Sequence, residues 1–223
     1  VGGGHVQLDG HLFRAMGWRA TASMGAVVAH HTTPLGAVLR ELRAAEQRAK
    51  SCGRDAFSIA LMKRGGGTTQ LTCGFGMLAH VDAATVQTAD DTPLGVLRAL
   101  RDYLEQSRRA AYHASQWLPG LPASSEGLDR ERYQKMLAQN LAWQMNRQKS
   151  PTSDLTAADV TALAARVTDL ALAEVLRREG LSGTAAQTVS ATELIGHMLG
   201  HMEFLARPER RREGSTGRPA AAE

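Results

Sequence analysis

The chain has 223 residues, of which 43% are hydrophobic, so it can bury a core as one large domain or two small ones. Its formal net charge of +4 is a modest indication of a phosphate-bearing partner such as RNA or a nucleotide. Two cysteines without zinc-type spacing argue against a disulfide framework and for a reducing compartment. No apolar run approaches the roughly 20 residues that cross a bilayer, so we expect a cytoplasmic protein without a membrane anchor.

The first third of the chain predicts a strand followed by a helix. Residues 11–17 suggest a short helix near the start. Residues 19–30 predict a strand, because their apolar run Ala26-Val27-Val28-Ala29 suits a buried position. The next segment, from Thr33 to the capping glycine Gly53, predicts an amphipathic helix. Its apolar stripe is expected to face the core, with Arg48 facing out; the stripe comprises Leu35, Val38, Leu39, Leu42, Ala45 and Ala49.

A hairpin is expected after this helix. Residues 56–62 alternate as a strand does, Lys63 to Gly67 forms a turn, and residues 68–73 predict the returning strand. The glycine-rich turn lacks the following helix and the Gly-Lys-Ser/Thr ending of a phosphate-binding loop, which favours a plain hairpin.

Beyond residue 91 the pattern is almost entirely helical. Thr92-Pro93 is a helix start signal, and four helices are predicted, at 93–117, 129–148, 155–179 and 187–206. The arginine-rich end is expected to be disordered. The chain is therefore expected to be α+β, with an α/β domain (1–90), a helical domain (91–206) and a tail (207–223).

Two motifs stand in residues 20–57: Thr21-x-Ser23-x-Gly25 at the start of the strand, and Ala49-Lys50-x-x-Gly53-Arg54-Asp55 at the end of the helix. Both resemble the second half of the palm domain of GGDEF nucleotide cyclases. A closer resemblance rests on Ala29-His30 followed by Pro34-Leu35, and on the turn Lys63-Arg64-Gly65-Gly66. This arrangement is similar to the large GGDD-type subunit of type III CRISPR effector complexes, especially the III-B kind.

The resemblance implies a partial ferredoxin-like, GGDEF-like palm, which is a β-α-β unit plus a hairpin, followed by an all-α helical bundle domain. It implies that the complete palm uses ATP and Mg²⁺ to make cyclic oligoadenylates when the complex binds target RNA. The nucleotide or phosphate contacts are then Lys50, Arg54, Ser23 and His30, the last by its position alone. The implied partners are the other subunits of the complex, CRISPR RNA and target RNA, with no membrane.

The chain also departs from that family. No Gly-Gly-Asp-Asp sequence occurs in it, the glycines before His5 carry no carboxylate pair, and Thr32 stands where the family has lysine. We therefore expect the C-terminal part of a larger subunit, or a truncated relative. It is expected to hold no catalytic residue and no metal site, and to be inactive alone.

Simpler interpretations of these residues remain open. Lys50 and Arg54 could complement the helix C-terminus, and Ser23 could be a small residue in tight packing. The pair His197 and His201, four apart, is expected to be a packed helix face and not a metal site.

Arg108 and Arg109, near two aromatic residues, are weak candidates for RNA binding, with a solvated helix junction as the alternative. Two other functions are also retained. One is a GGDEF-type cyclase relative that uses GTP. The other is a non-catalytic helical assembly or RNA-binding module.

Overall fold

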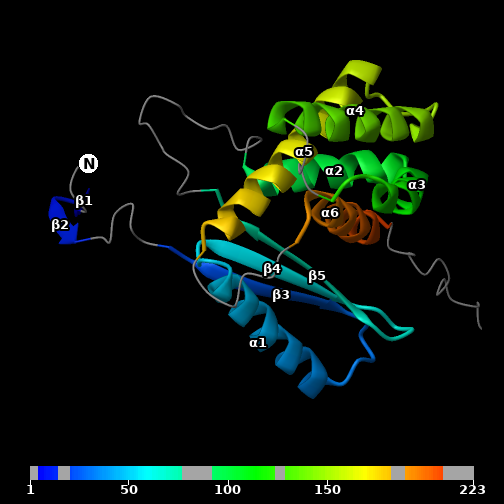
Figure 1. Cartoon of the computed structure of the whole chain (residues 1–223). Coiled ribbons are helices and arrows are strands. Elements are labelled where there is room, and N and C mark those ends of the chain that lie inside the picture. Colours follow the sequence, from blue (N-terminus) through cyan, green and yellow to red (C-terminus); the bar gives the residue numbers. More distant parts are fainter. Residues whose placement is uncertain (1–4, 15–20, 77–91, 124–128, 182–188, 208–223) are drawn as a thin grey trace, which may run out of the picture.

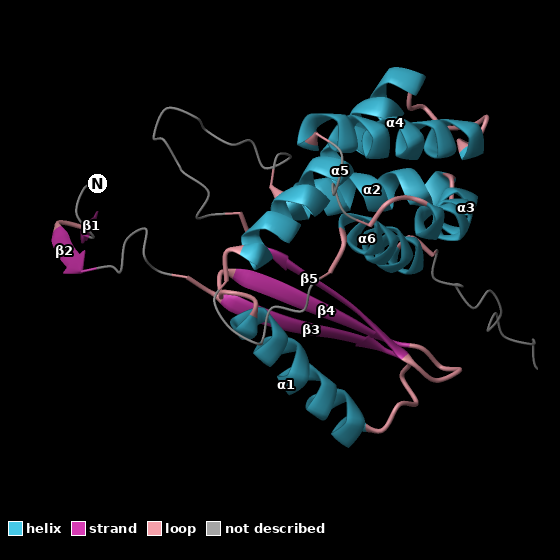
Figure 2. Cartoon of the chain, viewed as in Figure 1, coloured by secondary structure: helices cyan, strands magenta, loops and turns pink. Residues whose placement is uncertain are grey.

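The computed structural model describes residues 5–14, 21–76, 92–123, 129–181 and 189–207. Within these ranges the protein is α+β, as expected from the sequence. A three-stranded sheet lies between helix α1 on one face and the other helices on the opposite face (Figure 1). Figure 2 separates helices from strands and shows α2 to α6 gathered on one side of the three-stranded sheet, with α1 on the other side.

The sheet consists of β3 (Ser23–Ala29), β4 (Ala56–Met62) and β5 (Thr68–Gly74), in that order. Helix α1 (Leu35–Ser51) connects β3 to the parallel strand β4, and a tight turn connects β4 to the antiparallel strand β5. The first residues of β3 and β4 are paired in the register. The C-terminal end of α1 therefore meets the starts of both parallel strands at one end of the sheet.

Helix α1 packs closely on β3 because Gly25 has no side chain there. A Cβ atom at Gly25 would lie 2.6 Å from the backbone nitrogen of Glu46 and 2.9 Å from the carbonyl oxygen of Leu42. Ala45 and Ala49 are completely buried in this contact. Small residues on both elements thus set the short distance between helix and sheet.

The predicted apolar stripe of α1 is only partly correct. Leu35, Leu39 and Leu42 are 70%, 45% and 38% exposed. Arg48, predicted to face out, instead donates to Glu41 (2.7 Å) and to Ser58 Oγ on β4 (3.3 Å). Helical periodicity places the three leucines on the flank of α1 away from Arg48 and Glu41. That flank lies beyond the β3 edge of the sheet, and no further described strand covers it.

The N-terminal region contains a hairpin, and the helix predicted from residue 11 is wrong. Strands β1 (His5–Leu8) and β2 (His11–Arg14) pair antiparallel around Asp9 and Gly10. Both turn residues have positive φ, 49° and 79°. An Asp-Gly pair favours this two-residue turn, which closes the hairpin before a helix can start.

The remaining helices agree with the predicted ones except at one break. They are α2 (Pro93–Gln106), α3 (Arg109–Trp117), the short 3-10 helix η3 (Leu118–Gly120), α4 (Arg130–Gln148), α5 (Ala157–Glu179) and α6 (Ala191–Leu205). The predicted helix 93–117 is interrupted at Ser107, whose Oγ accepts a 2.9 Å hydrogen bond from the Ser150 amide. Capping boxes at Thr156 and Ser190 explain where α5 and α6 begin.

One hydrophobic core joins the sheet to the helices. Phe57 and Leu71 from the strands belong to the same buried cluster as Leu100 of α2 and Leu141 of α4. The predicted boundary near residue 90 and, apart from Arg207, the predicted tail (207–223) lie outside the described residues. None of the helices in the described ranges combines the length and apolar character that crossing a membrane requires.

Candidate functional site

Three of the four predicted phosphate contacts lie at one end of the sheet, which we call the Lys50 end. Lys50 is in the last turn of α1, and Arg54 follows that helix directly. Ser23 begins β3 and pairs with Ala56, two residues after Arg54. Lys50 and Arg54 are exposed and Ser23 is half-buried, so all three can be reached from solvent.

The backbone between α1 and β4 turns sharply at the Lys50 end. Gly53, Arg54 and Asp55 have successive positive φ values of 85°, 61° and 44°. This turn is fixed on two sides: the Asp55 carbonyl accepts from the Phe75 amide at 2.8 Å, and Gly53 fits against Leu181, where a Cβ would lie 2.7 Å from a methyl group. The Arg54 side chain therefore projects from a rigid turn.

The two cations at this end differ in their electrostatic environment. Lys50 Nζ lies 2.6 Å from Glu46 Oε1, and the hydrogen bond and charge of Lys50 lower the pKa of Glu46. Arg54 forms no ion pair with any acidic side chain in the described ranges. A phosphate could therefore bind Arg54 without breaking an ion pair, whereas Lys50 would have to break its ion pair with Glu46 to bind the same phosphate.

A buried charged cluster beside the Lys50 end was not predicted from the sequence. Glu174 of α5, only 3% exposed, accepts from the Gly74 amide at 3.1 Å and binds Arg177 (2.7 and 2.8 Å) and Arg178 (2.8 Å). Arg178 also donates to the Thr72 carbonyl at 2.6 Å. Arg177 donates to the carbonyl of Cys52, at the end of α1. The cluster therefore ties α5 to the outer edge of β5 and to the turn that carries Arg54.

Glu174 is ionised in this environment. Burial alone would raise its pKa, but hydrogen bonds and charge from Arg177, with further hydrogen bonds from Arg178 and the Gly74 amide, outweigh burial and lower it. The backbone groups at Thr72 and Gly74 are satisfied by the side chains of α5, as buried polar groups must be. The sequence shows only three charged residues, Glu174, Arg177 and Arg178, near the end of a predicted helix. It does not indicate that Glu174 accepts a hydrogen bond from Gly74, 100 residues away.

The fourth predicted contact, His30, lies at the opposite end of the sheet, the His30 end. It follows the last residue of β3, and a seven-residue strand separates it from Ser23, roughly 20 Å. One phosphate group therefore cannot touch both His30 and Lys50. The structure brings His30 instead toward His31, with ring centres 4.2 Å apart, and toward Arg64 in the β4–β5 turn.

The His30 end is also basic. His30 Nδ1 lies 2.8 Å from Thr32 Oγ1. Partial desolvation lowers the pKa of His30, and the charges of His31 and Arg64 lower it further. The β4–β5 turn closes through a hydrogen bond from the Gly66 amide to the Lys63 carbonyl at 3.1 Å. It is a plain hairpin turn, as predicted.

Arg108 and Arg109 are both exposed at the start of α3. Tyr112, on the same helix, is 64% exposed, but Trp117 packs against the core. The predicted RNA-binding pair, Arg108 and Arg109, therefore lies at a solvent-facing helix junction with one exposed aromatic ring, that of Tyr112.

The predicted packed helix face is correct for His201 only, because His197 is exposed. His201 is 1% exposed and its Nδ1 lies 2.8 Å from the His197 carbonyl. Burial lowers the pKa of His201, and partial desolvation lowers that of His197. In the described ranges no three His, Cys, Asp or Glu side chains come together as a metal site would require.

Comparison with known proteins adds no relative. No family model, curated protein or solved structure matches this chain.

Proposed function

We propose that this chain is the second half of a palm domain and the helical bundle domain of a type III CRISPR large subunit. In the complete palm it would supply cationic contacts for the phosphates of ATP during cyclic oligoadenylate synthesis. The observation that carries the proposal is the Lys50 end. There, Lys50 and Arg54 stand at the junction of α1 and β4, beside Ser23 at the start of the parallel strand.

The open edge of the sheet supports a larger palm. Among the described elements β3 pairs only with β4, and Gly25 through His30 are each only partly buried. The exposed side chains of Leu35, Leu39 and Leu42 extend beyond that edge. An edge strand with apolar surface beside it is suited to pairing with further strands, which the other part of a palm would provide.

Each residue at the Lys50 end has a specific proposed role. Arg54 binds phosphate oxygens with its guanidinium, which matches phosphate geometry, and Lys50 adds a point charge when it leaves Glu46. Ser23 donates its hydroxyl to the same phosphates. His30 belongs to a separate contact with Arg64 at the other end of β3, where Lys63 follows the residue paired with Ala29.

The described residues offer no open pair of carboxylates at the Lys50 end. The described acidic side chains near the Lys50 end include Glu46, which is paired with Lys50, Asp55, which is buried, and Glu174, which is buried and paired with Arg177 and Arg178. These residues do not fit a Mg²⁺ ion, which is held by carboxylates with open access to water and phosphate. The carboxylates that hold Mg²⁺ would therefore come from the other part of the proposed large subunit.

A second candidate function is a non-catalytic helical assembly or RNA-binding module. The same shortage of paired carboxylates favours it, because such a module needs none. A GGDEF-type relative that uses GTP is a third candidate, and the long helical part of the chain argues against it.

Oligoadenylate synthesis by the complete effector complex tests the proposal. Lys50→Ala should lower synthesis at least about ten-fold, because a hydrogen bond to a charged group is lost, while the complex still assembles. Arg43→Ala, an exposed cation on the same helix, is the matched control and should leave synthesis unchanged. Full synthesis by Lys50→Ala would refute the phosphate role.

A further inference from the structure

The outer face of α4 carries a row of basic and aromatic side chains. Exposed residues recur at the spacing of successive helical turns, and together they form what we call the α4 stripe: Arg132, Lys135, Gln139, Trp143 and Arg147. The opposite face, with Tyr133, Leu137 and Leu141, is buried. Among the helices, α4 lies farthest from the sheet (Figure 1). The residues of the α4 stripe are exposed, so no described element covers them.

The cations of the α4 stripe are not neutralised within the fold. Arg132, Lys135 and Arg147 make no ion pair with any acidic side chain in the ranges that the structure describes. Elsewhere, Lys50 of α1 is paired with Glu46 and Arg101 of α2 with Asp102, whereas Arg40 and Arg43 of α1 are exposed and also make no ion pair in the described ranges. The stripe thus presents positive charge that is available to an external anion.

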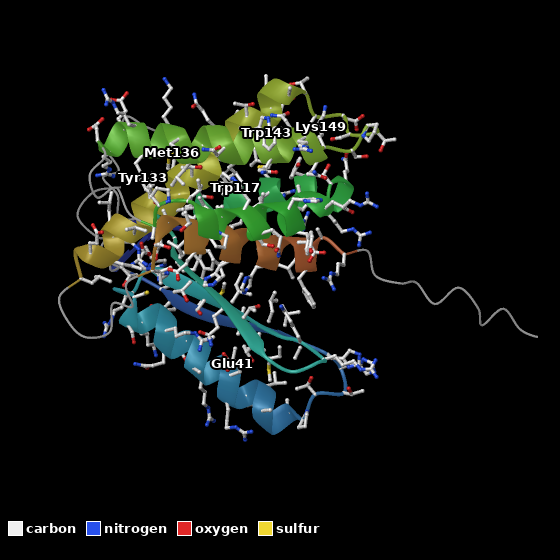
Figure 3. All side chains as sticks on the ribbon, turned by 45° about the vertical axis from the view of Figure 1, so that its right-hand side comes forward. Glu41, Trp117, Tyr133, Met136, Trp143 and Lys149 are labelled. Carbon is white, nitrogen blue, oxygen red and sulfur yellow. The ribbon has the colours of Figure 1, made fainter. Side chains whose placement is uncertain are left out.

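Trp143 adds a flat stacking surface to this charge. Its side chain is 56% exposed, and the guanidinium of Arg147 lies over the ring, 5.1 Å from its centre. Figure 3 labels Trp143 on α4 and Lys149, which directly follows the last residue of that helix. A tryptophan held by an arginine offers both a stacking face for a base and a cation for the adjoining phosphate.

We propose that the α4 stripe binds single-stranded RNA. From Arg132 to Arg147 it extends about 22 Å at 1.5 Å per residue, long enough to contact several nucleotides. Unpaired bases fit it better than a duplex, because only exposed bases can stack on Trp143. An acidic protein fits less well, because Trp143 is the stripe's one large apolar side chain and protein interfaces bury a wider apolar centre.

This inference names the RNA-contacting surface of the proposed ribonucleoprotein subunit, and in that sense it rests on the proposed function. The two can fail separately. Binding of free RNA to the chain requires no oligoadenylate synthesis, and the synthesis assay of Lys50→Ala does not involve α4.

The test measures binding of a fluorescein-labelled oligouridine of about 20 nucleotides, longer than the expected contact, to the full chain by fluorescence anisotropy at several salt concentrations. With three phosphate contacts, the logarithm of the binding constant should fall with the logarithm of salt with a slope of about −2. In Lys135→Gln/Arg147→Gln the slope should weaken by about 1.4, two contacts' worth. Trp143→Ala should weaken binding at least about five-fold.

Arg40→Gln/Arg43→Gln is the matched control, because both residues are exposed cations on the outer face of α1 and the charge change is the same. It should bind RNA as the unaltered chain does. Equal losses in both double variants would overturn the proposal in favour of general attraction to a basic chain. Unchanged binding by the α4 double variant, with helical circular dichroism intact, would overturn it as well and leave an acidic protein as the partner to examine.

Discussion

Replacing Glu174 with alanine should destabilise the protein more than most single substitutions. The change removes the acceptor for four hydrogen bonds, from the Gly74 amide, from Arg177 twice and from Arg178. It leaves the Gly74 amide without its acceptor and Arg178, 7% exposed, without its counter-charge. The expected loss reflects these buried groups and not the net value of the ion pair.

The magnitude follows from which groups stay buried. Breaking a buried ion pair from one side costs about 3–5 kcal/mol. Arg177, whose side chain is 29% exposed, can regain water and adds little. At about 2–4 °C per kcal/mol for a chain of this size, the melting temperature should fall by roughly 6–20 °C.

Thermal unfolding followed by circular dichroism at 222 nm is a suitable assay for Glu174→Ala. Asp102→Ala is the matched control, because Asp102 pairs with Arg101 at the surface, where both side chains are about half exposed. It should melt with the unaltered protein. A Glu174→Ala variant that also melts with the unaltered protein would show that the cluster does not hold α5 to the sheet.

Three further outcomes follow from the structure. The pKa of Glu174 is lowered on folding, so the stability it contributes is present above its unfolded pKa, about 4.3, and is lost as pH falls below that value. The difference in urea midpoint between the unaltered protein and Glu174→Gln should therefore shrink toward pH 3, and a constant difference would contradict this. Gly25→Ala should lower the free energy of unfolding by about 1–3 kcal/mol because the new methyl group pushes α1 away from β3. Gly36→Ala, in the first turn of α1, is the control and should not destabilise the protein. Urea denaturation measures both variants, and equal stability of the two would refute the close packing of α1 on β3. Burial raises the pKa of the Cys73 thiol, so it should react with Ellman's reagent only after unfolding, and rapid labelling of the folded protein would place it elsewhere.

Local patterns predicted the central elements of the fold well. Alternating apolar residues gave β4, and the glycine turn after Lys63 gave the hairpin to β5. The Thr92-Pro93 start signal is present as predicted, with the Thr92 hydroxyl accepting from the Gly95 amide at 3.1 Å. These features are determined by neighbouring residues, so the sequence alone suffices for them.

Features that depend on distant residues were missed. The break at Ser107 depends on Ser150, and the partners of Glu174 lie on another element of the fold. The exposure of the α1 leucines reflects how narrow the described sheet is, which periodicity along one helix does not reveal. The grouping of His30 with Lys50 came from the family resemblance, which does not specify distance, and β3 separates the two residues.

The most direct test of the central proposal is mass spectrometry of the assembly purified through this chain from its native host. We expect repeated backbone subunits and a repeat-derived CRISPR RNA to co-purify with it, along with the polypeptide that carries the paired carboxylates. Recovery of the chain free of RNA and of such subunits would contradict membership of a type III effector. It would leave Lys50 and Arg54 as charges that complement the end of a helix.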